Sequence, residues 1–166
     1  LYTSVGSRIY LFLERFEMKK ATVVVPNSEA GREFVISRGI PQEITRVIYN
    51  GIDPERISID KTKDEMFSEY SIPQKCLVAG TVGRIEEQKD PVTLLKAAEL
   101  VVKEIPNAIF VFVGDGPIKA EMENFAKQLG IAQNCRFVGN QKKVANFVNL
   151  MDVFVLVSKT IEGCSN

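Results

Sequence analysis

The chain has 166 residues, with 21 Lys and Arg residues against 21 Asp and Glu residues and no His. A net charge of zero provides no positive field to attract a phosphate backbone, so binding to nucleic acid is disfavoured. The lack of His excludes Ser-His-Asp, Cys-His and His-ligated metal mechanisms within the chain. Any chemistry must therefore use Arg, Lys, Glu, Asp or backbone groups.

The cysteines and the chain ends bear on the cellular context. No apolar run approaches the roughly 20 residues of a membrane-spanning helix, so no transmembrane segment is predicted. Cys76, Cys135 and Cys164 are widely spaced and odd in number, which indicates neither a disulfide framework nor a zinc site and favours a reducing cytoplasm. The chain starts without Met and stops just after a strand, so we expect a fragment of a longer protein.

The N-terminal part predicts helices and short strands. Over residues 5–21, apolar residues recur at i, i+3, i+4 and i+7, which is typical of an amphipathic helix. A strand is expected at residues 22–25 and another at 45–49, where an Asn-Gly turn follows. Between them, Ser28 is placed to cap a helix that runs to about residue 38.

From residue 63 onwards, strands and helices alternate. A short helix at 63–70 precedes apolar strands at 76–83, 109–113, 136–138 and 153–157, and helices begin near Pro91, Ile118 and Val144. The helix after Pro91 carries an apolar face of Leu94, Leu95, Ala98, Val101, Val102 and Ile105. This alternation predicts an α/β fold, a Rossmann-like doubly wound parallel sheet with helices on both faces. Ligands of such sheets bind at the carboxyl ends of the strands.

The loop after the first of these strands carries two cations, Arg84 and Lys89, just before a helix N-terminus. A planar guanidinium, an ammonium and the helix dipole together favour an anion. The alternative is that both are solvated charges that pair with neighbouring carboxylates: Glu86, Glu87 and Asp90.

Two further loops at strand ends are candidate sites. Gly114-Asp115-Gly116 fits the start of a dinucleotide fingerprint, but Lys119 stands where Gly or Ala is expected, so a tight turn is the simpler interpretation. After the last strand, Glu162 would project into the crevice, and backbone N–H groups from Gly163 onward can stabilise phosphate. The alternative there is an ordinary polar loop with Ser165 as a cap.

Several short motifs occur in the order and spacing of a known family. They are Val82-Gly83-Arg84-Ile85 with Gln88-Lys89, Val113-Gly114-Asp115-Gly116-Pro117, Phe137-Val138-Gly139, Val157-Ser158 and Glu162-Gly163-Cys164-Ser165-Asn166. Along residues 45–166 the chain resembles the donor-binding half of retaining GT-B glycosyltransferases of the group 1, or family four, type. Asn50-Gly51-Ile52-Asp53 resembles that family's entry into its second domain.

The resemblance implies one half of a GT-B fold and the end of the other half. Residues 1–48 would be the tail of the N-terminal acceptor domain, and residues 49–166 the C-terminal donor-binding domain, truncated before its last helices. The implied reaction transfers a sugar from a UDP- or GDP-linked donor to a glycan or lipid-linked acceptor with retention, as in polysaccharide biosynthesis. The fragment alone is expected to be inactive, because most of the acceptor half is missing.

Roles for individual residues also follow from the resemblance. Arg84 and Lys89, beside Gly83, would clamp the donor diphosphate and stabilise charge on the leaving nucleotide. Glu162 would position the donor sugar. Backbone contacts to sugar or phosphate would come from Gly163, Cys164, Ser165 and Asn166, and the main chain would read the base at Val138, Gly139 and Asn140.

The same resemblance implies no metal and no other cofactor. It also implies a cytoplasmic location, with any peripheral association at the inner face of the membrane depending on the missing N-terminal half. Two other functions stay open: a GT-B nucleotide-sugar epimerase, against which the Glu-Gly-x-x-Asn ending argues, and a non-catalytic Rossmann-like binding or interaction module. In the latter, Arg84 and Lys89 would be surface charges only.

Overall fold

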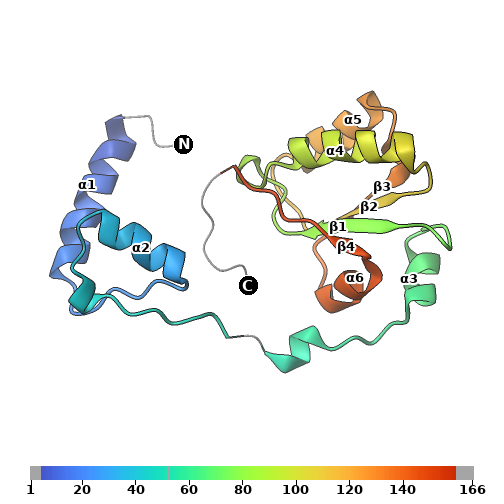
Figure 1. Cartoon of the computed structure of the whole chain (residues 1–166). Helices are drawn as coiled ribbons and strands as arrows, with labels where there is room; N and C mark the ends of the chain where they lie inside the picture. The colour runs from blue at the N-terminus through green and yellow to red at the C-terminus, as the bar shows by residue number, and fades with distance from the viewer. Residues whose placement is uncertain (1–4, 52, 160–166) are drawn as a thin grey trace. The chain divides into compact units, whose positions relative to one another are not determined.

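The computed structural model describes residues 5–51 and 53–159, and the chain divides near residue 52 into two compact units. The first unit contains helices α1 (Val5–Lys20) and α2 (Glu29–Ser37) and the 3-10 turn η1 (Gln42–Ile44) (Figure 1). Ser28 caps α2 as expected, because its hydroxyl accepts a hydrogen bond from the Gly31 backbone N–H at 3.0 Å.

The strands expected in the first unit are reduced to a single bridge. Val24 pairs with Thr45 in parallel, and within residues 5–51 neither 22–25 nor 45–49 forms a longer strand. The neighbouring apolar side chains Val23 and Val25 are exposed. A two-stranded pairing with little to cover its faces is marginal, which explains why the prediction of two full strands is wrong.

The second unit is a four-stranded parallel sheet in the order β3-β2-β1-β4. The strands are β1 (Val78–Val82), β2 (Ile109–Val113), β3 (Cys135–Gly139) and β4 (Val153–Phe154). Helices α4 (Pro91–Glu104) and α5 (Lys119–Gln128) cover one face, and α3 (Lys63–Glu69) and α6 (Val144–Leu150) cover the other (Figure 1). The 3-10 turns are η2 (Pro54–Ile57), η3 (Glu87–Lys89) and η4 (Ala132–Asn134). The predicted α/β fold class is confirmed.

The core lies on both sides of β2. Phe110 and Phe112 pack with α4 and α5, whereas Ile109, Val111 and Val113 pack with α3 and α6. Alternate side chains of a strand point to opposite faces of the sheet, so a strand that helices cover on both faces carries apolar residues at every position. This is why the apolar run of β2 is continuous.

Two elements of this unit differ from expectation at their ends. β4 pairs with β1 over two residues only, and Val153 and Phe154 are exposed, because among the described residues β4 lies at an edge of the sheet with no strand beyond it. The predicted five-residue buried strand is therefore wrong. In the last turn of α4, Val102 packs against the core while Val101 and the C-cap residue Ile105 are exposed, so the buried face is narrower than predicted.

A first prediction concerns Cys135 in β3. Burial raises the pKa of this thiol to about 12, so it stays protonated and inert in the folded protein. We expect no alkylation of Cys135 by iodoacetamide at mildly alkaline pH without denaturant, and full alkylation with it, measured by mass spectrometry of the Cys135 peptide. Because folding raises this pKa, the thiol also lowers stability as pH rises above its ordinary value of 9.0. Rapid labelling of the folded protein would contradict the assignment.

Candidate functional site

The chain reverses its direction across the sheet at β1. It proceeds from β1 to β2 and β3, and then α6 returns it to β4 on the other side of β1. The strand order therefore reverses beside β1, and doubly wound sheets bind their ligands at the carboxyl ends of the strands at such a point. A pocket lies there, and its lining includes Gly83, Arg84, Ile85, Lys89, Val113, Leu156 and Val157.

The loop after β1 brings Lys89 to the N-terminus of α4. The turn η3 ends at Lys89, and Asp90 then adopts a left-handed backbone with φ +43° and ψ +52°. Its carboxylate caps α4 by accepting bonds from Thr93 N at 3.4 Å and Thr93 Oγ1 at 2.8 Å. The Thr93 hydroxyl lowers the pKa of Asp90, and the ammonium of Lys159 acts in the same direction. The helix dipole at this point favours negative charge near Lys89.

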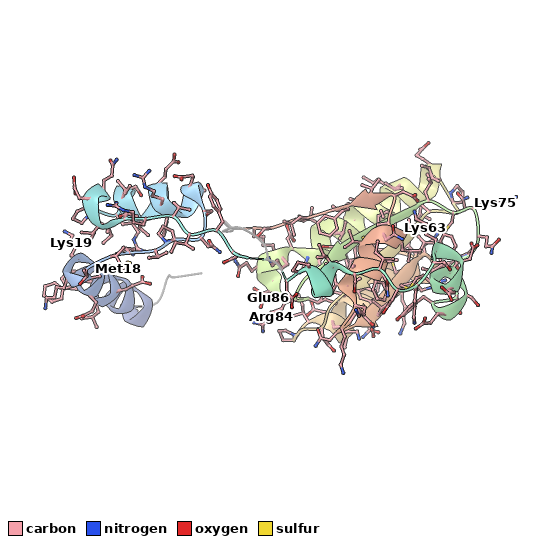
Figure 2. The ribbon with its side chains drawn as sticks, turned by 90° about the horizontal axis from the view of Figure 1, so that it is seen from below. Met18, Lys19, Lys63, Lys75, Arg84 and Glu86 are labelled. Carbon is pink, nitrogen blue, oxygen red and sulfur yellow. The ribbon has the colours of Figure 1, made fainter. Side chains whose placement is uncertain are left out.

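Arg84 presents most of its side chain to solvent. The side chain is 73% exposed, and its NH2 nitrogen lies 3.7 Å from Glu86 Oε2. Figure 2 shows both residues at the end of the second unit opposite to Lys63 and Lys75. The pairing with a neighbouring, half-buried carboxylate is thus present, but it is weak, because the two atoms lie 3.7 Å apart and the guanidinium is largely in solvent. The guanidinium can exchange Glu86 for a stronger anion.

The loops after β1 and β2 are in direct backbone contact. Ile85 N donates to Asp115 O at 3.0 Å. A Cβ at Gly116 would overlap the Ile85 carbonyl, and one at Gly114 would overlap the Gly83 carbonyl. Glycine is required at both positions because the backbones of the two loops approach each other too closely for a Cβ atom. This favours the tight-turn interpretation of Gly114-Asp115-Gly116 over a dinucleotide fingerprint.

The segment that is predicted to contact the nucleotide base lies at the end of β3, the strand next to β2. Val138, Gly139 and Asn140 are not among the residues that line the pocket, but Gly114 N donates to Gly139 O at 2.8 Å, which sets the loop after β3 against the loop after β2. The Val138 carbonyl accepts a bond from Gln141 Nε2 at 2.6 Å. Sequence reasoning gave no role to Gln141, because nothing in its local pattern indicates this contact.

The predicted residues after β4 are only partly described. Outside the described residues lie Glu162, Gly163, Cys164, Ser165 and Asn166. Immediately before them, Ser158 Oγ and Lys159 N both donate to Gln88 O, at 3.1 and 2.9 Å. The sequence gave no site role to Ser158 or Lys159, although both follow a strand next to the reversal point, which is the signal that could have indicated them.

Metal ligands and membrane spans were sought in the same residues. Within 5–51 and 53–159, no three side chains of the kinds that bind metal ions gather at one place. In those ranges every helix is too short or too polar to traverse a bilayer. The same ranges contain no buried side-chain nitrogen or oxygen that lacks a hydrogen-bond partner.

The chain matches two protein-family models. Residues 62–165 match the family described as glycosyl transferases group 1, and this match covers more than half of the chain. Residues 1–56 match the family described as Glycosyltransferase Family 4.

Curated relatives are longer than this chain. The Vi polysaccharide biosynthesis protein VipC/TviE of Salmonella typhi is 32% identical over 126 residues, which are 73% of this chain and 21% of the relative. The lipopolysaccharide core biosynthesis glycosyltransferase LpsE of Rhizobium meliloti (strain 1021) is 30% identical over 136 residues, 81% of this chain and 37% of the relative. The chain thus spans between about a fifth and two fifths of these relatives.

Solved structures have the same fold. WaaG, a glycosyltransferase involved in lipopolysaccharide biosynthesis, superposes with a TM-score of 0.77 at 17% identity, over 94% of this chain and 44% of that one. Anabaena Alr3699/HepE, solved in complex with UDP, gives a TM-score of 0.74 at 22% identity, over 86% of this chain and 40% of that one. At these identities the likeness concerns the fold, and it agrees with the Rossmann-like sheet described above.

The close approach at Gly116 generates a stability prediction. Gly116→Ala forces a methyl group into the Ile85 carbonyl and should lower the free energy of unfolding by about 2 kcal/mol or more, measured by urea denaturation. Gly130→Ala is the matched control. It has open space but a left-handed backbone, so about 1 kcal/mol is expected. Equal losses in the two variants would contradict the contact.

The weak pair at Arg84 generates a binding prediction. Glu86→Gln removes the carboxylate that competes for the guanidinium, so inorganic pyrophosphate should bind about two- to fivefold more tightly by isothermal titration calorimetry. Glu87→Gln removes the same charge from the next residue and serves as the control. An equal gain in both variants would show that the effect comes from the change in net charge and not from a specific competition of Glu86 for Arg84.

Proposed function

Because the chain belongs to the group 1 glycosyl transferases, we propose that it carries the nucleotide-sugar site of an enzyme that transfers a sugar from a UDP- or GDP-linked donor to a glycan or lipid-linked acceptor. Residues 49–166 would form the donor-binding domain, and residues 1–48 the end of the acceptor domain. Transfer would proceed with retention of configuration in the cytoplasm. Alone, this part of the enzyme would bind the donor without turnover.

The observation that carries the proposal is the position of Arg84 and Lys89. Both line one pocket at the carboxyl end of β1, where the chain reverses direction, and Lys89 precedes the N-terminus of α4. A diphosphate matches this set, because a guanidinium fork, an ammonium and a helix dipole can share its charge. Structural neighbours have been solved with UDP and with UDP-glucose, which supports this class of ligand.

In the proposed reaction, Arg84 and Lys89 would contact the leaving group, which is the nucleoside diphosphate. As the bond between the sugar and the diphosphate breaks, negative charge grows on the diphosphate, and Arg84 and Lys89 would stabilise it. Glu162 would position the sugar, with the backbone of Gly163, Cys164, Ser165 and Asn166 around it. We propose no metal, since these cations would supply the positive charge.

The base would contact the loop after β3. We assign this contact to the main chain of Val138, Gly139 and Asn140, which the hydrogen bond between Gly114 and Gly139 connects to the loop beside Gly83. A nucleotide would then extend along the carboxyl edge of the sheet, with its base at β3 and its diphosphate at β1.

The test is nucleotide binding by variants of the two cations, in the complete natural protein. UDP, GDP and ADP are titrated, and the nucleotide that binds most tightly is used for the variants. Arg84→Ala and Lys89→Ala should each weaken its binding by about 1 to 3 kcal/mol, as the loss of a charge-assisted hydrogen bond would.

Lys63→Ala is the control, because Lys63 lies at the opposite end of the unit (Figure 2). Wild-type affinity in both cation variants would reject the site and favour the non-catalytic binding module, in which these charges are only part of the surface.

A further inference from the structure

Lys119 extends from the start of α5 towards the end of β3. The side chains of a helix lean towards its N-terminus, and α5 begins at Lys119, so this side chain reaches back towards the carboxyl edge of the sheet. Its ammonium nitrogen lies 3.7 Å from the point that a Cβ atom on Gly139 would occupy. Gly139 has φ +70° and leaves that space open. The loop after β3 thus has a cation beside its main chain.

The ammonium of Lys119 keeps hydrogen-bond donors for a ligand. In the described part of the chain it pairs with Glu123, whose Oε1 atom is 4.0 Å away, which is beyond hydrogen-bond distance. The Lys119 side chain is 25% exposed and that of Glu123 is 42% exposed. Because a pair at this distance with a half-exposed partner is weak, an oxygen atom of a ligand can take the place of the carboxylate.

Two acceptors of the loop after β3 are already engaged. The Val138 carbonyl accepts a hydrogen bond from Gln141 Nε2 at 2.6 Å, and the Gly139 carbonyl accepts one from Gly114 N at 2.8 Å. The ammonium of Lys119 can only donate hydrogen bonds. A ligand group that accepts, such as a carbonyl oxygen, therefore matches this place better than an amino group does.

This place fits the base of a nucleotide whose diphosphate lies at β1. β3 is two strands away from β1 in the sheet, which is roughly 10 Å at the usual strand spacing. A nucleoside diphosphate is long enough to cover that separation. Its base would lie at Gly139 and its phosphates at Arg84 and Lys89.

We propose that Lys119 determines base specificity, because its ammonium donates a hydrogen bond to a carbonyl oxygen of the base: O4 of uracil or O6 of guanine. Cytosine and adenine carry an amino group at the corresponding atom, and an amino group does not accept that bond. The inference rests on the proposed function, since it requires a nucleoside diphosphate held at Arg84 and Lys89. It adds one side chain to the main-chain contacts assigned to the loop after β3.

Two pairs of ligands isolate this bond in the complete natural protein. UDP and CDP differ at C4 of the base, and GDP and ADP differ at C6, where one member carries an oxygen and the other an amino group. The pair that contains the more tightly bound nucleotide is titrated by isothermal titration calorimetry. The ratio of its two affinities is then compared between variants, so that other differences between the two bases cancel.

Three variants test the side chain. Lys119→Met removes the ammonium but keeps an unbranched stem, and Lys119→Arg keeps a charged donor. Lys127→Met removes the same charge from the last turn of α5 and is the matched control. Inorganic pyrophosphate, which has no base, is titrated as well, because it reports the diphosphate site alone.

The expected results separate base recognition from a loss of charge or of structure. Wild-type protein should bind the nucleotide with the carbonyl oxygen more tightly than its amino counterpart. Lys119→Met should lower this ratio by about three- to thirtyfold, whereas Lys119→Arg and Lys127→Met should leave it within about twofold. Pyrophosphate should bind Lys119→Met and Lys127→Met equally. A partly unfolded variant would lose affinity for both nucleotides alike and keep the ratio.

Specific outcomes would overturn the inference. An unchanged ratio in Lys119→Met would reject it, and the proposed function would stand if Arg84→Ala still weakens both nucleotides. A loss of pyrophosphate affinity in Lys119→Met beyond that in Lys127→Met would assign Lys119 to the phosphates and reject its role at the base. Failure of the wild-type protein to bind any of the four nucleotides would reject the proposed function, and this inference with it.

Discussion

The burial of β2 on both faces is the constraint on which the rest of the second unit depends. Its five residues are all buried, and the ring of Phe112 stacks on that of Phe137 in β3, with centroids 4.5 Å apart. A strand with two apolar faces needs helices above and below, and parallel strands need crossovers of one hand. The helices on both faces, and the parallel neighbours β1 and β3, follow from that requirement.

The reversal of the strand order at β1 positions the candidate site. The chain forms β2 and β3 on one side of β1 and then pairs β4 with its other side, and the carboxyl ends of the strands at such a point are where doubly wound sheets bind ligands. Neither Arg84 nor Lys89 is placed by the core directly. Each is carried by a loop whose position depends on backbone bonds to its neighbours, such as that from Ile85 to Asp115.

Sequence patterns correctly predicted the elements that are determined by their own residues. They failed for strands whose formation or length depends on the strands beside them. The unbroken apolar run of β2 and the helical spacing of α4 were sufficient for the fold class. The strands at 22–25 and 45–49, and the length of β4, depend on how many strands lie beside them, which a local pattern does not contain. Among the candidate site residues, Arg84 and Lys89 were predicted because both follow one strand, whereas the contacts of Gln88 with Ser158 and Lys159 join loops about 70 residues apart, and a local pattern does not contain such contacts.

The glycine contacts between the loops have a consequence for how the sequence can change. At Gly114 and Gly116, main-chain atoms of one loop lie against main-chain atoms of the other, so the separation of the loops is set by the polypeptide backbone itself. Substitutions of surrounding surface side chains leave this spacing unchanged. The outer surface of these two loops can therefore diverge in sequence while the two glycines, and the backbone spacing that they permit, stay constant.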